Sequence, residues 1–157
     1  MTVNEAANKW DFLNDLQKSF QFDLKTADDE AVLTNRSTGE SIEIIEEKYT
    51  TASYGDKIPE VYCEYIVCFS TQHRHFEDLS DAADYVRLIL NDEVLPIEFY
   101  QNGERRFGGD IRRTDFYNLT AEFLSKEFCH SADHISQLEY EIHSWSGKYN
   151  IERRRFE

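Results

Sequence analysis

The sequence predicts an α+β fold, a single domain in which two to three helices cover a mostly antiparallel sheet. Several segments alternate apolar and polar residues and are joined by short polar turns, which is typical of antiparallel hairpins. Other segments repeat apolar residues with the helical period. The chain has 157 residues, 40% of them hydrophobic, with only two Pro and six Gly. Because this length suits one core and leaves no linker, we expect residues 1–157 to form one domain.

The expected order of elements is α-β-β-β-α-β-β-α-β-β, beginning with a helix and a hairpin. Residues 4–20 predict an amphipathic helix whose apolar side chains recur at helical spacing. These side chains are Ala6, Trp10, Leu13, Leu16 and Phe20. Residues 31–36 and 41–47 predict two strands around a polar turn, in which Gly39 can adopt a positive φ.

The middle of the chain predicts a buried strand followed by a helix. Residues 61–69 are apolar on both faces, which is typical of a central strand. Asp78 is expected to cap a helix over residues 79–91, where apolar residues recur at i, i+3, i+4 and i+7.

A second hairpin follows. Residues 97–100 and 105–112 flank Asn102-Gly103, the dipeptide favoured by a two-residue type I′ turn. Paired glycines at 108–109 interrupt the return strand and predict a bulge or a close approach of backbone.

The last third predicts a short helix followed by a segment that fits two kinds of structure. Asn118 is expected to cap a helix that ends near Phe128. Residues 132–145 fit either a helix or a strand. We favour a C-terminal hairpin, because residues 148–156 resemble a strand that needs a partner.

The charge is strongly acidic and uneven. The formal net charge is -14 and the sequence pI is about 4.7. Residues 1–100 hold 21 acidic and 8 basic residues. Generic nucleic-acid binding and attraction to an anionic membrane both need a basic face and are disfavoured. With no apolar run of membrane-spanning length and no signal peptide, the sequence predicts a cytoplasmic protein in which Cys63, Cys68 and Cys129 are reduced.

The favoured function is non-enzymatic binding of a cationic protein. In composition the chain is similar to inhibitors and immunity proteins that occlude basic nuclease sites, and Tyr54 or Tyr62 is expected to supply an apolar anchor. A hairpin with clustered aromatic and Arg residues is a further candidate. The predicted partner-binding residues are Asp28, Asp29, Glu30, Glu46, Glu47, Asp81, Asp84, Tyr100, Arg105 and Arg106.

Two alternatives remain. His73 and His75 would share one face of an extended segment, and with Cys129 they could join His130 and His134 in a zinc site of a metal-dependent hydrolase. The second alternative is a structural module with no catalytic activity. No nucleophile elbow, phosphate-binding loop or dinucleotide fingerprint is present, so no catalytic residue and no cofactor other than zinc is predicted.

Overall fold

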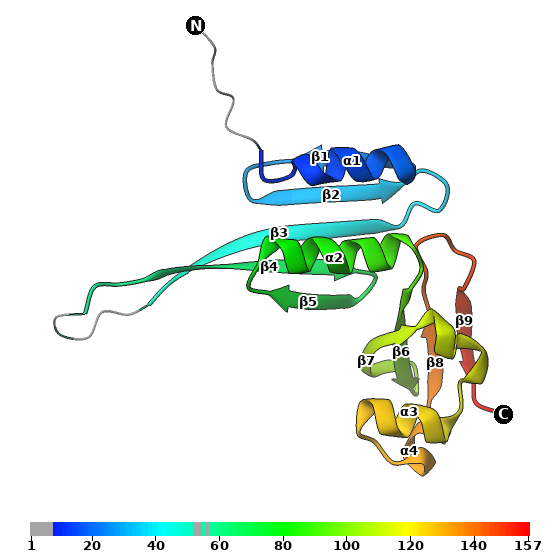
Figure 1. The fold of residues 1–157 in the computed structure, drawn as a ribbon. Helices are drawn as coiled ribbons and strands as arrows, with labels where there is room; N and C mark the ends of the chain where they lie inside the picture. The colour runs from blue at the N-terminus through cyan, green and yellow to red at the C-terminus, as the bar shows by residue number, and fades with distance from the viewer. Residues whose placement is uncertain (1–7, 52–54, 56) are drawn as a thin grey trace, which may run out of the picture.

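The computed structural model describes residues 8–51, 55 and 57–157. The fold is α+β, as predicted, but it contains two antiparallel sheets in place of one (Figure 1). The helices are α1 Asp11–Ser19, α2 Leu79–Leu90, the 3-10 helix η1 Arg113–Asn118, α3 Ala121–Phe128 and α4 Ala132–Ser136. The strands are β1 Phe22–Thr26, β2 Glu30–Asn35, β3 Ser41–Thr50, β4 Val61–Phe69, β5 Gln72–Phe76, β6 Val94–Gln101, β7 Glu104–Arg112, β8 Glu139–Ile142 and β9 Ile151–Arg155.

The first sheet is a meander in the order β1-β2-β3-β4-β5, so each strand pairs with its neighbour in the chain. Both α1 and α2 lie on the same face of this sheet (Figure 1). The sheet and the helices share a buried apolar core. Its largest members include Trp10, Leu13, Phe22, Leu33, Ile42, Ile44, Phe69 and Ile89.

The second sheet has the order β7-β6-β8-β9, and α3 and α4 pack on one face of it. Its core is a separate cluster that includes Leu95, Ile97, Phe99, Leu124, Leu138 and Ile142. The opposite face is polar. There Glu98 is fully buried and forms an ion pair with Arg105.

Contacts from three segments join the two sheets. Trp145, which follows β8, packs into the core of the first sheet, and its backbone carbonyl accepts a hydrogen bond from Asn35 Nδ2 at 2.7 Å. Gln72 Nε2 on β5 donates to Glu98 Oε1 at 2.6 Å. Tyr85 on α2 donates to Asp110 on β7 at 2.5 Å.

Several predicted elements are confirmed. The hairpin of β6 and β7 turns at Asn102 (φ 53°) and Gly103 (φ 80°), where a type I′ turn requires both positive φ values. The strand over 61–69, the helix that starts after Asp78 and the C-terminal hairpin are also present. Asp78 occupies the N-cap of α2, but its side chain makes no capping hydrogen bond.

Other expectations were wrong in detail. The cap of α3 is Thr120, whose Oγ1 accepts a hydrogen bond from Phe123 N at 3.1 Å, because residues up to Asn118 form η1. The expected interruption of the return strand was wrong, because the glycine pair lies within continuous β7 and the register shift occurs between Phe99 and Tyr100. The close approach of backbone was confirmed at Gly108, where a Cβ atom would lie 2.7 Å from the oxygen of Ile97. Residues 4–7 of the predicted first helix lie outside the described residues, and α1 begins at Asp11. No described helix is both long and apolar enough to cross a membrane.

Candidate functional site

One face of the first sheet is left uncovered by α1 and α2, which both pack on the other face (Figure 1). We call it the open face. Alternation along the strands assigns its side chains. They are Asp23, Lys25, Glu30, Val32, Thr34, Ser41, Glu43, Ile45, Glu47, Tyr49, Tyr62, Glu64, Ile66, Cys68, His73 and His75.

The centre of the open face is apolar and its surroundings are acidic. Ile45 lies opposite Ile66, while Val32 and Cys68 lie in the adjacent row, and all but the buried Ile66 are half-buried. Within that row Glu43 lies between Val32 and Cys68, and Lys25 lies beside Val32. Further carboxylates lie around the centre at Glu30, Glu47 and Glu64. An apolar centre with a polar rim is the usual anatomy of a protein interface.

Neighbouring groups and burial raise the pKa of two ionisable side chains on the open face, Glu43 and Cys68. A hydrogen bond with Glu30, followed by burial and charge repulsion, raises the pKa of the Glu43 carboxyl. Burial and the neighbouring Glu43 raise the pKa of the Cys68 thiol above its ordinary value. Cys68 is therefore a neutral thiol at neutral pH, and it lacks the thiolate that a catalytic cysteine needs.

The open face continues onto a projecting hairpin. Beyond Ile45 and Tyr65, β3 and β4 pair only with each other, and they extend away from the remaining strands (Figure 1). We call residues 47–50 and 61–64 the hairpin arm. Tyr49 and Tyr62 lie opposite each other there and are 45% and 51% exposed.

The phenols of the arm are tied to carboxylates. Tyr49 donates to Glu47 and, at 2.9 Å, to Glu64, while Tyr62 donates to Glu60 at 2.7 Å. These hydrogen bonds raise the pKa of both phenols, so the rings stay neutral. The arm thus presents exposed aromatic rings among negative charges. Tyr54, the other predicted anchor, lies outside the described residues.

The structure separates the predicted acidic residues into different surfaces. Glu30 and Glu47 belong to the open face. Asp81 and Asp84 are exposed on α2, which covers the opposite side of the sheet. Asp28 and Asp29 lie in the turn before β2, beside Glu46. One flat interface therefore cannot include all of them.

Glu46 serves the fold as an ion-pair partner. Its side chain is only 6% exposed and bonds to Lys9, with Lys48 at 3.6 Å. The hydrogen bond from Lys9 holds the pKa of Glu46 below its ordinary value.

We expect Glu46→Gln to lower the free energy of unfolding by about 1 kcal/mol at pH 7, because it removes a charge-assisted hydrogen bond. A carboxylate whose pKa is lowered by folding stabilises the protein above its unfolded-state pKa, and this stabilisation is lost as the pH falls through the folded-state pKa. The difference between variant and wild type should therefore shrink below about pH 4. Thermal unfolding of the wild-type protein and of Glu46→Gln at several pH values measures this difference in unfolding free energy. A difference that does not change with pH would contradict a lowered pKa for Glu46.

The predicted binding residues on the hairpin of β6 and β7 differ in their exposure and in their contacts. Tyr100 is only 8% exposed; it donates to Glu141 at 2.6 Å, and Arg153 lies 3.5 Å from its ring centroid. Arg105 and Arg106 are both exposed, but Arg105 forms an ion pair with the buried Glu98. Tyr100 and Arg105 are therefore held within the polar face of the second sheet.

The four predicted metal-binding histidines lie in two places. His73 and His75 share a face of β5, as predicted, with ring centroids 5.3 Å apart, and His75 Nδ1 lies 2.6 Å from Glu64 Oε1. His130 and His134 belong to the α3–α4 region, where His130 stacks on Phe107. Among residues 8–51, 55 and 57–157, no group of three or more His, Cys, Asp or Glu side chains is arranged to hold a metal ion. A zinc site stays a prediction.

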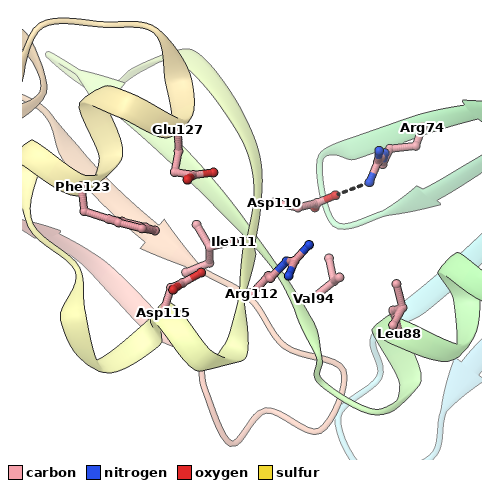
Figure 2. Close-up of a pocket in the computed structure, with 9 residues that line it drawn as sticks. All are labelled: Arg74, Leu88, Val94, Asp110, Ile111, Arg112, Asp115, Phe123 and Glu127. Carbon is pink, nitrogen blue, oxygen red and sulfur yellow. Dashed lines mark ion pairs between the residues drawn. The ribbon is translucent and has the colours of Figure 1, made fainter.

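A groove runs along β7, and no sequence pattern indicates it; we call it the β7 groove. A cavity of about 480 Å³ is lined on one side by Phe123, Asp115 and Glu127 and on the other by Arg74, Leu88 and Val94 (Figure 2). Its floor is formed by consecutive residues of β7, namely Asp110, Ile111 and Arg112.

Asp110 is the most constrained ionisable group in this groove. Its Oδ2 accepts a hydrogen bond from Tyr85 and lies 3.6 Å from Arg74 Nη1, while its Oδ1 is buried without a hydrogen-bond partner. Burial raises the pKa of Asp110, and the contacts with Tyr85 and Arg74 oppose that increase only in part. A buried acceptor without a donor carries a desolvation cost that a bound donor would remove.

Comparison of the chain with protein families, with curated proteins and with solved structures found no match.

Proposed function

We propose that this protein is a non-enzymatic binding domain that occludes a basic surface of another protein with its open face and hairpin arm. The observation that carries the proposal is the apolar centre of the open face, which no described helix covers and which carboxylates surround. A net charge of -14 favours a cationic partner.

The two parts of this surface have different tasks. Burial of the half-buried Ile45 and of the exposed Tyr62 ring supplies most of the affinity, because desolvated aromatic and aliphatic side chains dominate binding energies. Glu47 and Glu64 attract Lys and Arg of the partner, which raises the association rate and fixes orientation more than it raises affinity. Tyr49 links these two carboxylates and holds them in place.

The test compares two double variants that change the net charge equally. Glu47→Lys with Glu64→Lys reverses two charges on the open face, and Asp81→Lys with Asp84→Lys reverses two charges on α2. Wild-type protein serves as bait in a lysate of the source cell, and the retained protein is purified and identified. We expect the open-face variant to bind this identified partner with an association rate constant at least about tenfold lower than that of the wild-type protein at low salt. Surface plasmon resonance measures this rate constant.

The α2 variant should associate at nearly the wild-type rate, since its charges lie on the opposite side of the sheet. Raising the ionic strength should reduce the difference between the variants, because salt screens steering. If the α2 variant is the one that loses binding, or if both bind like wild type, the open face is not the interface.

A further inference from the structure

The outer edge of β7 carries backbone groups that have no strand partner. β7 is a terminal strand of its sheet, and no described strand pairs with its other side. Arg113 N donates to Glu93 O at 3.0 Å, which makes those two residues a hydrogen-bonded pair. Because hydrogen-bonded and non-hydrogen-bonded pairs alternate in an antiparallel ladder, Arg112 and Asp110 form non-hydrogen-bonded pairs with β6. Their N–H and C=O groups therefore point away from β6.

A second hydrogen bond independently indicates which backbone groups of β7 point away from β6. Pro96 lies opposite Asp110, and its carbonyl accepts from His143 N, on the β8 side, at 3.1 Å. Pro96 therefore directs its backbone carbonyl toward β8 and not toward β7. The two observations agree that the backbone of Asp110 faces the free edge.

The β7 groove lies along this free edge. A second cavity of about 340 Å³ shares Leu88, Val94 and Arg112 with the first and continues past Arg113 and Thr114. In the first cavity, side chains stand on both sides of β7, with Phe123 and Glu127 on one side and Arg74 and Leu88 on the other (Figure 2). Such a shape suits an extended chain, whose side chains would alternate between the two walls.

We propose that the β7 groove binds an extended segment of a partner protein, which pairs with β7 as an added strand and directs a Lys or Arg side chain to Asp115 and Glu127. Phe123 lies on the same wall and would contact the aliphatic stem of that side chain. Asp110 Oδ1, which is buried and unpartnered, would accept a hydrogen bond from the occupant. This site is separate from the open face and does not depend on the function proposed for it.

A second copy of this chain fits the groove less well than a single strand does. If the β7 strands of two copies paired edge to edge, the second copy would bring not only its β7 but also the side chains that line its own groove on either side of that strand. Those walls flank β7 on both sides, so they would meet the walls of the first copy (Figure 2). An isolated extended segment carries no such obstruction.

The test isolates one backbone donor. Arg112 has φ -83° and ψ 144°, which proline can adopt, and its N–H points away from β6, so Arg112→Pro removes an outward donor and leaves the ladder with β6 intact. Arg112→Ala is the matched control, because it removes the same side chain and keeps the N–H. A phage-displayed library of random linear dodecapeptides, selected on the wild-type protein, supplies the probe.

We expect the enriched peptides to share a basic residue, to bind Arg112→Ala nearly as well as wild type and to bind Arg112→Pro at least about tenfold more weakly. Glu127→Lys should weaken binding of the same peptides. On the wild-type protein, a bound peptide should slow hydrogen exchange at the amides of Asp110 and Arg112 and leave those of Gly109 and Ile111, already bonded to β6, unchanged. This last measurement holds even if Arg112→Pro fails to fold.

The proposal is overturned if no peptide is enriched, if the enriched peptides bind Arg112→Pro and Arg112→Ala equally, or if the amides of Asp110 and Arg112 exchange at the same rate with peptide bound. Analytical ultracentrifugation tests the other occupant. A dimer of the wild-type protein that Arg112→Pro abolishes and Arg112→Ala retains would assign the edge to a second copy and would also overturn it.

Discussion

Trp145→Ala is expected to lower the free energy of unfolding by about 3–5 kcal/mol, the usual cost of removing a large aromatic side chain from a core. Trp145 is 4% exposed and its ring centroid lies 6.3 Å from that of Phe69. It comes from the segment between β8 and β9, yet it packs in the core of the first sheet. The substitution therefore leaves a cavity where the two halves of the molecule meet.

Urea unfolding followed by circular dichroism and by the fluorescence of Trp10, the remaining tryptophan, measures this change. Tyr117→Ala is the control, because that ring is 77% exposed and its loss should change the free energy by no more than about 0.5 kcal/mol. A loss below about 1 kcal/mol for Trp145→Ala would show that this side chain is not part of the first core.

The second large effect is expected at Gly108. A Cβ atom there would lie 2.7 Å from the backbone oxygen of Ile97 and 2.8 Å from Glu98 Oε2, and it would overlap Gln72 Nε2. Backbone cannot move as readily as the end of a side chain. We expect Gly108→Ala to cost about 2–3 kcal/mol of unfolding free energy, at the upper end of typical overpacking.

A double variant separates the sources of this cost. Gln72→Ala removes the flexible amide but leaves the oxygen of Ile97 in place. Adding Gln72→Ala to Gly108→Ala should therefore recover only part of the lost stability in a double-mutant cycle by denaturant unfolding. Full recovery would mean that the side chain alone excludes a Cβ atom, and wild-type stability for Gly108→Ala would contradict the close packing of β5 against β7.

The elements that sequence reasoning predicted are those with strong local signals. Asn102-Gly103 can satisfy a type I′ turn without any tertiary contact, and the apolar residues of α2 repeat over three turns. β1 and β5 were missed because each has five residues and little apolar character, and β5 carries two histidines and an arginine. Such a strand exists because β4 supplies a partner, which local sequence does not record.

The open face could not be predicted because it depends on where the helices pack. In β3, Glu46 points to the helix-covered side, where Lys9 neutralises it, while Ile45 points to the open side. This reverses the usual assignment of apolar residues to the core and charged residues to solvent. The β7 groove was equally inaccessible, since its walls come from segments distant in the chain, including Arg74 and Glu127.

The position of β9 at the end of the second sheet has a consequence for self-association. An unpaired strand edge is a template on which copies of a protein can aggregate. β9 ends in Arg153, Arg154 and Arg155, so a second copy that approached this edge would meet like charges across the new strand pair, which is unfavourable. The far end of the sheet is thus protected against fibre-like growth by electrostatic repulsion, while β7, at the other end, is restricted by the shape of its walls.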